Sequence, residues 1–267
     1  GEVFDVPAEK GVTRNISRSP GSNDRSADWS PDGKYIAWIG DASDETEIYL
    51  YDVAEGSYKQ LTTGADTYIR SIQWAPDSKH LLITDRKNRL DEVSLDGKRR
   101  NIQTNPHGEF RNVAYSPDSK WLAYTKTGSN HFDVVYLYNI ADDKEYPVTD
   151  GWYDSGIPSF SSDGKYLLYT ANTEMKPIYS RIEWNFAMTN MGATYMVMLA
   201  KDTPSPLLPT DGVSVEEKGS GKAGKKDKSA SEESKVKVVI DIDGLQDRVI
   251  KLPFNAGYNY FCDGKKV

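Results

Sequence analysis

Trp29-Ser30-Pro31-Asp32-Gly33-Lys34-Tyr35-Ile36-Ala37-Trp38 is the stretch of sequence that decides the fold, because the chain repeats its pattern three more times. Each copy has an aromatic residue, a polar turn and a hydrophobic strand, and the other copies begin at residues 74, 115 and 160. Between the aspartates of successive turns the separations are 45, 41 and 45 residues. This period is typical of a β-propeller blade of four strands. The repeat therefore predicts an all-β fold, a β-propeller with four-stranded antiparallel blades.

The residues of the turn explain why the chain reverses there. Pro31 fixes φ near the value that the first central position of a type I turn requires, and Asp32 tolerates the next position while its carboxylate accepts backbone N–H groups. Gly33, or a serine in its place, then lets the chain turn back. Alternating polar and apolar residues flank the turn, as they do in half-buried strands, so each copy is predicted to be a hairpin.

Two further strands follow each hairpin. In the first copy an aromatic-rich strand at 47–53 leads through a tight turn at 54–57 into a short strand at 58–62, and the third copy repeats this order at 133–149. We therefore expect blades near 18–63, 64–104, 105–149 and 150–209.

The two ends of the chain match different parts of a repeat. Residues 2–6 and 13–17 match the third and fourth strands, so the chain is expected to begin halfway through a blade. Residues 254–267 resemble the opening hairpin of a further repeat. Residues 1–267 are thus predicted to be one partial propeller domain with about four to five blades.

Composition and charge restrict the kinds of partner. The net charge of −7 disfavours nucleic acid and anionic membranes, which select basic surfaces. No apolar run is long enough to span a membrane. The single cysteine, Cys262, excludes an internal disulfide and favours a cytoplasmic location, with the periplasm as the alternative.

Residues 171–193 interrupt the fourth copy with a segment that is too long and too aromatic for a simple hairpin loop. Its large side chains are Ile178, Tyr179, Ile182, Trp184, Phe186 and Met188. Long loops on a rigid scaffold often form lids or contact surfaces. The alternative is that these side chains cover the edge of the blade, and the sequence leaves both open.

A second interruption, at residues 213–235, is predicted to be a disordered insertion because it is of low complexity and highly charged. Residues 219–225 imitate a phosphate-binding loop. However, Lys226 stands where a magnesium-binding serine or threonine is needed, and no hydrophobic strand precedes the run.

The sequence offers no candidate catalytic, cofactor-binding or metal-binding residues. His80, His107 and His131 do not have the spacing of zinc ligands. Cys262 lies in a predicted inner strand without an adjacent base, which is typical of a small buried hydrophobe. No Gly-x-Ser-x-Gly nucleophile motif is present. No cofactor is therefore expected.

The acidic residues have simpler explanations than metal binding. Asp241 and Asp243 resemble the start of a calcium loop, but the further ligands are missing. The acidic residues between Asp41 and Glu47 are predicted to lie in a solvated loop. Asn15 matches the glycosylation pattern, which matters only in a eukaryotic secretory route.

Two segments near the ends of the chain resemble the propeller region of tricorn-type proteases. The first is Gly1-Glu2-Val3-Phe4-Asp5-Val6-Pro7-Ala8 with Gly11-Val12-Thr13-Arg14-Asn15-Ile16-Ser17. The second is Ile240-Asp241-Ile242-Asp243-Gly244-Leu245-Gln246-Asp247-Arg248-Val249-Ile250-Lys251-Leu252-Pro253 with Gly257-Tyr258. The turn repeats alone are less specific, because TolB-like and dipeptidyl-peptidase propellers share them. The resemblance covers nearly the whole chain outside 171–193 and 213–235.

This resemblance implies that the chain is the opening part of the second, seven-bladed propeller of a large serine peptidase. The catalytic Ser, His and Glu of that family would lie outside this chain. The propeller would guide or filter peptides and unfolded polypeptide toward a protease core. Its partners would be those substrates and the remaining domains of the peptidase, and a homo-oligomer is compatible with it. The alternative is a TolB-like propeller that serves as a protein-binding scaffold.

Overall fold

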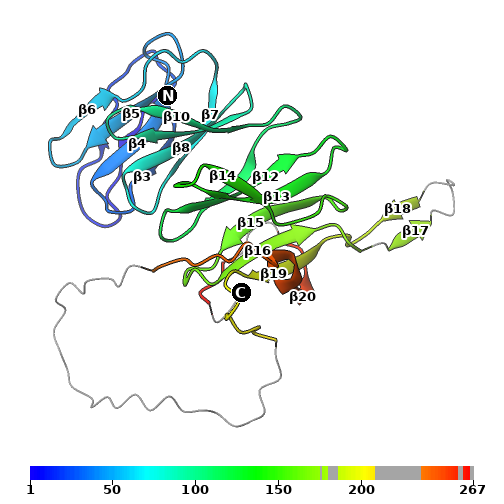
Figure 1. The fold of residues 1–267 in the computed structure, drawn as a ribbon. Coiled ribbons are helices and arrows are strands. Elements are labelled where there is room, and N and C mark those ends of the chain that lie inside the picture. The colour runs from blue at the N-terminus through cyan, green and yellow to red at the C-terminus, as the bar shows by residue number, and fades with distance from the viewer. Residues whose placement is uncertain (175, 180–185, 208–235, 258–260, 265–267) are drawn as a thin grey trace, which may run out of the picture.

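The computed structural model describes the chain except for residues 175, 180–185, 208–235, 258–260 and 265–267 (Figure 1). In this part of the chain, four antiparallel sheets of four strands follow one another in sequence order, and each sheet is one blade. The predicted all-β propeller fold is therefore confirmed. A single turn of 3-10 helix, η1 (Leu245–Arg248), directly precedes the last strand, β20 (Val249–Asn255).

The strands of each blade run from the inner to the outer edge in chain order. The first blade contains β3 (Arg25–Trp29), β4 (Tyr35–Gly40), β5 (Glu47–Asp52) and β6 (Ser57–Gln60). The second contains β7 (Ile69–Trp74), β8 (His80–Asp85), β9 (Arg89–Ser94) and β10 (Arg99–Thr104). The third contains β11 (Arg111–Tyr115), β12 (Trp121–Thr127), β13 (Asp133–Asn139) and β14 (Lys144–Pro147). The fourth contains β15 (Ser155–Phe160), β16 (Tyr166–Ala171), β19 (Ala193–Met198) and β20 (Val249–Asn255).

This up-and-down order gives the molecule two different faces. The tight turns between the first and second strands, among them residues 30–34, lie on what we call the turn face. The loops between the second and third strands and the connections from one blade to the next lie at the opposite ends of the strands, on what we call the loop face.

The repeated turn forms as its residues predict. The Ser30 hydroxyl donates to Asp32 Oδ1 at 2.7 Å and accepts from the N–H of Tyr35 at 2.9 Å. Gly33 has φ of 70°, a left-handed conformation that glycine adopts without strain. Ser116 and Ser161 make the same bonds in the third and fourth blades, whereas at Ala75 of the second blade the backbone alone bonds His80. Each hairpin is thus closed locally, so the turn sequence carries most of the information for it.

The same turns also connect neighbouring blades. In the second and third blades a serine replaces the turn glycine, and both serines adopt φ of 59°. The hydroxyl of Ser78 accepts from the N–H of Asp32 at 3.0 Å, and that of Ser119 accepts from the N–H of Asp77 at 3.0 Å. Each serine thus satisfies a backbone donor of the blade before it.

Hydrophobic cores lie between the blades. Ile39 and Leu50 of the first blade pack with Leu81 and Ile83 of the second. Leu122 of the third blade packs against the second, and further buried residues fill the space between the third and fourth. Because each core is shared by two blades, stability depends on neighbouring repeats.

The N-terminal residues form a short ribbon beside the first blade. β1 (Phe4–Asp5) pairs with β2 (Arg14–Asn15), as expected for the third and fourth strands of a blade. Val3 and Ile16 are buried against Trp38 of the first blade. The ribbon therefore packs on the first blade as a neighbouring blade would.

The predicted interval 150–209 for the fourth blade ends too early. Its outer strand is β20, which pairs with β19 from Val197 opposite Val249 to Ala193 opposite Asn255. The insertion at 213–235, which lies outside the described residues, separates these strands in sequence, so no local repeat signals their pairing. Of residues 254–267, predicted to open a further blade, 254 and 255 instead end β20.

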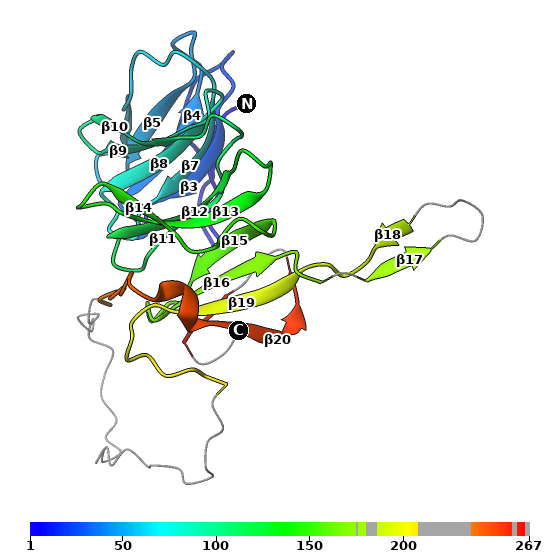
Figure 2. The same cartoon turned by 45° about the vertical axis from the view of Figure 1, so that its right-hand side comes forward.

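Residues 171–193 leave the fourth blade as a ribbon of β17 (Pro177–Tyr179) and β18 (Phe186–Met188). Figures 1 and 2 show that this ribbon projects away from the blades, and Ile178 is 54% exposed. The described part therefore does not cover the edge of the blade. Ile182 and Trp184 of the predicted aromatic cluster lie outside the described residues.

Candidate functional site

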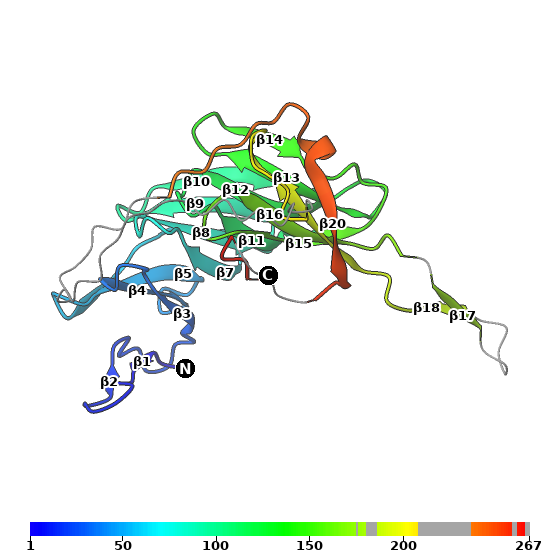
Figure 3. The same ribbon diagram turned by 90° about the horizontal axis from the view of Figure 1, so that it is seen from below.

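The inner strands of the four blades, β3, β7, β11 and β15, form a wall on the concave side of the molecule. Figure 3, the view from below, shows how the blades curve around this side. In a propeller such strands line the central axis. Ala27 and Asp28 of β3 and Ser71 of β7 are exposed on this wall. The described part of the wall is thus a solvent-accessible surface of mixed polarity.

Arginine recurs at the same position of three successive inner strands. Arg25 begins β3, Arg70 is the second residue of β7, and Arg111 begins β11. Each stands seven residues before the aspartate of its own turn, and Gly156 takes this position in the fourth blade. Because all three lie where their strands start, they share the loop-face end of the wall. We call these three residues the arginine arc.

Contacts across the blades hold the arc in place. The Arg25 guanidinium lies 4.3 Å from the centre of the Tyr68 ring and donates to the carbonyl oxygens of Ile69 and Arg70. Arg70 pairs with Glu109, and Arg111 Nη2 donates to Glu109 Oε1 at 2.8 Å. One carboxylate therefore serves two guanidinium groups.

The arc retains exposed positive charge. The side chains of Arg70 and Arg111 are 38% and 66% exposed, so water and ligands reach them. Glu109 pairs with two of the three arginines, so the arc carries a positive surplus, although the whole chain carries a net charge of −7. A guanidinium offers five donors in a planar fork that suits carboxylates and carbonyl oxygens.

β-Bulges bend the inner strands next to the arc. The register of the inner strands shifts between Arg25 and Asp28, between Arg111 and Ala114, and between Gly156 and Ser159. Ile157 has φ of 52°, which is an uncommon conformation for a β-branched residue. Bulges of this kind redirect side chains, and they are frequent beside binding sites.

Large apolar side chains are exposed on the loop face near the third and fourth blades. Phe132 lies between β12 and β13, and Trp152 and Tyr153 lie between the third and fourth blades. Their exposed fractions are 42%, 78% and 49%. Aromatic residues and arginine are both enriched in surfaces that bind other polypeptides.

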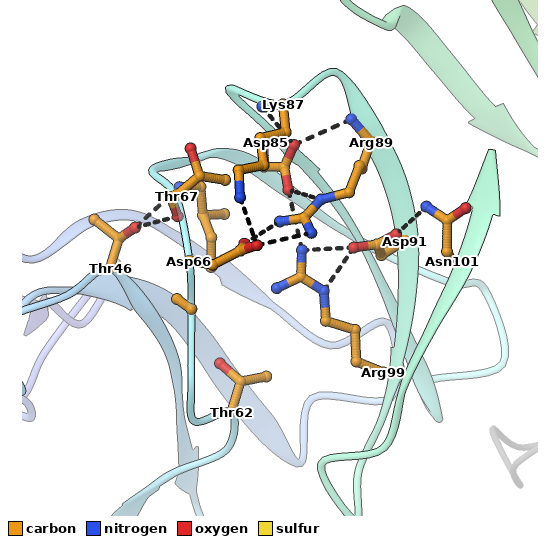
Figure 4. A network of polar contacts seen from close by, with 12 residues as sticks. Thr46, Thr62, Asp66, Thr67, Asp85, Lys87, Arg89, Asp91, Arg99 and Asn101 are labelled. Atoms are coloured by element: carbon orange, nitrogen blue, oxygen red, sulfur yellow. Dashed lines mark hydrogen bonds and ion pairs between the residues drawn. The ribbon is translucent and has the colours of Figure 1, made fainter. Parts of the chain in front are cut away.

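A network of charged side chains ties the strands of the second blade to the connection that leads into it from the first blade, and Figure 4 shows it. Asp85, which is buried, accepts from Arg89 Nε at 2.6 Å and from Arg99 Nη2 at 3.1 Å. Arg99 also donates to the buried Asp91 at 2.6 Å. Asp66, in the connection between the blades, pairs with Arg89, and this pairing holds its pKa well below the usual range. The network stabilises the second blade and holds the incoming connection against it, and it contains no unpaired nucleophile.

Glu47 does not lie in a solvated loop, as the sequence predicted for the acidic residues around it. It is buried at the start of β5, where it accepts from the Thr62 hydroxyl at 2.5 Å and from the N–H of Ala65 at 2.7 Å. The prediction failed because the bonding partners come from the following connection, which is distant in sequence.

The three histidines lie apart in the structure. His80 begins β8 and contacts Asp77 at 3.2 Å, whereas His107 and His131 are exposed in two loops. Within the described residues, no three histidine, cysteine, aspartate or glutamate side chains lie close enough together to hold a metal ion.

Cys262 is buried beside Met196 and Leu168, as expected of a small hydrophobe, although the described residues around it form no strand. Burial raises the pKa of its thiol. Asp243 pairs with Lys201 at 2.9 Å, and Asp241 accepts from the N–H of Lys201 at 2.7 Å. In the described part of the chain, no helix is long and apolar enough to cross a membrane.

Sequence reasoning did not find the arginine arc, although its signal was present. The arginines recur with the same separations of 45 and 41 residues as the turn aspartates. A comparison of the inner strands position by position would have revealed them.

A family model, curated proteins and solved structures all contain matches to this chain. A family model described as the second β-propeller domain of tricorn protease matches residues 1–261. Tricorn protease homolog 1 of Streptomyces coelicolor is 25% identical over 269 residues, which cover 96% of this chain and 24% of that protein. Tricorn protease of Thermoplasma volcanium is 27% identical over 175 residues, which cover 63% of this chain and 17% of that protein.

Among solved structures, the crystal structure of the tricorn protease matches with a TM-score of 0.72 and 16% identity over 91% of this chain and 22% of that chain. At this identity the match supports the fold alone. The chain spans about a quarter of the length of the Streptomyces relative.

Proposed function

Because this chain belongs to the family of tricorn protease second β-propeller domains, we propose that it guides or filters peptides and unfolded polypeptide toward a protease core outside the chain. The resemblance inferred from the flanking segments is thereby confirmed. The chain is the propeller part of a tricorn-like peptidase, and its gating role is the proposal.

The observation that carries this proposal is the arginine arc on the concave wall. An unfolded polypeptide presents free carbonyl oxygens, acidic side chains and a terminal carboxylate along an extended chain. A folded domain keeps most of its backbone oxygens in internal hydrogen bonds. Guanidinium groups at one end of a narrow wall therefore favour the unfolded chain.

The arc is well placed for transient binding. Arg70 and Arg111 share Glu109, so a substrate carboxylate competes with an existing ion pair. Partly exposed ion pairs are weak, and their exchange costs little. Such a surface can hold a passing chain without retaining it.

The alternative function, a TolB-like scaffold that binds a folded partner, has less support. The tricorn propeller model covers residues 1–261, which is nearly the whole chain. The arc also lies on a concave surface, which is less suited to a folded domain than to an extended segment.

Partners and location follow as further parts of the proposal. The remaining domains of the peptidase are expected to contact the propeller, and a homo-oligomer of the parent protein is compatible with this arrangement. A cytoplasmic location is favoured by the single buried cysteine, with the periplasm as the alternative.

A binding experiment with matched variants tests the proposal. A fluorescent, permanently unfolded acidic polypeptide is titrated with the protein and with a variant that carries Arg25→Gln, Arg70→Gln and Arg111→Gln. The control variant carries Lys34→Gln, Lys79→Gln and Lys120→Gln on the turn face, which removes the same charge.

The arc variant should bind about tenfold more weakly or worse, because it loses several charge-assisted hydrogen bonds. The control should bind nearly as the parent chain does. Equal losses in the two variants would mean that net charge alone governs binding and would contradict the proposal.

A further inference from the structure

A pocket of about 260 Å³ lies between the third and fourth blades, apart from the arginine arc. Its lining includes Val148, Ser155, Tyr169 and Ala171, which are buried, and Asp150, Tyr153 and Gln246, which are exposed. Small-molecule pockets usually have roughly 300–1,000 Å³. This pocket is slightly smaller, so it suits a single side chain of a longer ligand.

Aromatic rings form one side of the pocket. The rings of Tyr169 and Tyr195 stack with centroids 5.3 Å apart and an interplanar angle of 14°. The Tyr195 hydroxyl is 2.8 Å from the Thr173 hydroxyl, which fixes the ring. Tyr153 is 49% exposed, so part of its ring remains available. The faces of aromatic rings attract cations.

Asp150 places a negative charge in the same pocket. Its Oδ1 accepts from the N–H of Trp152 at 3.0 Å, and no cation among the described residues pairs with it. Burial raises the pKa of Tyr169, and the charge of Asp150 contributes, which agrees with the carboxylate lying near that ring.

The surroundings of the pocket add to this negative charge. Glu174 follows the lining residue Thr173, and its charge is balanced by Lys251. Asp154 precedes the lining residue Ser155 and has no ion pair with a described lysine or arginine. The described pocket therefore has a negative surplus, whereas the arc has a positive one.

We propose that this pocket receives a lysine or arginine side chain of the passing polypeptide, an inference that rests on the proposed function. Asp150 pairs with the cationic end, and Tyr153, Tyr169 and Tyr195 contact its aliphatic stem and charged head. The loop face thus has two unlike subsites, the arginine arc for carboxylates and carbonyl oxygens and this pocket for basic side chains.

The test uses two blocked heptapeptides of glycine and serine, one with a central lysine and one with norleucine, which has the same stem without the charge. Binding is measured by titration calorimetry with the complete chain and with Asp150→Asn. Asparagine can still accept the hydrogen bond from Trp152, so the loop should keep its conformation. Asp142→Asn, in the exposed turn between β13 and β14, removes the same charge on the turn face.

The parent chain and the Asp142→Asn control should bind the lysine peptide about five- to tenfold more tightly than the norleucine peptide, as expected for an ion pair combined with a cation–π contact. Asp150→Asn should abolish this preference. Tyr153→Ala should weaken the binding of both peptides.

Two results would overturn the inference, namely equal binding of the two peptides by the parent chain or an unchanged preference in Asp150→Asn. If either occurs while the arc variant still binds unfolded polypeptide more weakly than the parent chain does, the pocket inference alone is wrong. If the arc variant binds unfolded polypeptide normally, the proposed function fails, whatever the heptapeptides do.

Discussion

Replacement of Asp85 by asparagine should destabilise the second blade. Asp85 is 1% exposed, and it accepts from the N–H groups of Lys87 and Arg89 at 2.9 and 3.0 Å and from the guanidinium groups of Arg89 and Arg99. An asparagine keeps the size and one acceptor oxygen, but its NH₂ group would face the guanidinium donors. Two charge-assisted hydrogen bonds are then lost.

Each such bond contributes about 1.5–3 kcal/mol, and removal of one partner from a buried pair costs about 3–5 kcal/mol. Arg89 and Arg99 are 24% and 27% exposed and keep other acidic partners, so the lower end applies. We expect a loss of about 3 kcal/mol, which corresponds to a fall of about 6–12 °C in Tm for a domain of this size.

Thermal and urea unfolding followed by tryptophan fluorescence measure this effect. Asp96→Asn is the matched control, because it removes the same charge from a turn of the same blade where the side chain is 55% exposed. Its midpoint should stay close to that of the parent chain. If Asp85→Asn and Asp96→Asn have the same midpoint, the network does not stabilise the second blade and the reasoning is refuted.

Three further predictions concern the core, the turns and acid stability. Leu122→Ala, at a fully buried position between the second and third blades, should cost about 2–5 kcal/mol in urea unfolding, and a loss below about 1 kcal/mol would contradict the packing. Ser119→Ala should cost about 1 kcal/mol, because the N–H of Asp77 loses its acceptor, whereas an unchanged urea midpoint would show that this bond contributes nothing. The Lys251 ammonium lowers the pKa of Glu174 below 4.5, so the pair stabilises the fold above that pH and the contribution disappears as the pH falls through the lowered value. The Tm of Glu174→Gln should therefore fall less than that of the parent chain on acidification, and parallel curves would argue against the pair.

The blades could be predicted from the sequence because their information is local. In each turn, Ser30, Asp32 and Gly33 or their counterparts bond within a few residues of one another. The hairpins, the number of complete blades and the propeller fold therefore followed from one repeated pattern. The two flanking segments identified the family for the same reason, since each is a continuous stretch.

Features that depend on distant contacts could not be predicted in this way. β20 pairs with β19 across a long insertion, so most of its residues lay outside the predicted blade intervals. The burial of Glu47 depends on Thr62 and Ala65 in the following connection. The arginine arc becomes a site only when three blades stand side by side, and its periodic signal has no meaning within one strand.

The most direct test of the central claim is to map by photocrosslinking where an unfolded polypeptide contacts the propeller. A benzophenone photocrosslinker is attached to Ala27→Cys on the inner strand β3, and for comparison to Ser57→Cys on the outer strand β6, while the native Cys262 is buried and reacts poorly. The account predicts crosslinks to the polypeptide from position 27 and nearly none from position 57, with the position 27 crosslinks lost in the Arg25, Arg70 and Arg111 variant. Crosslinks of equal yield from both positions, or from position 57 alone, would contradict it.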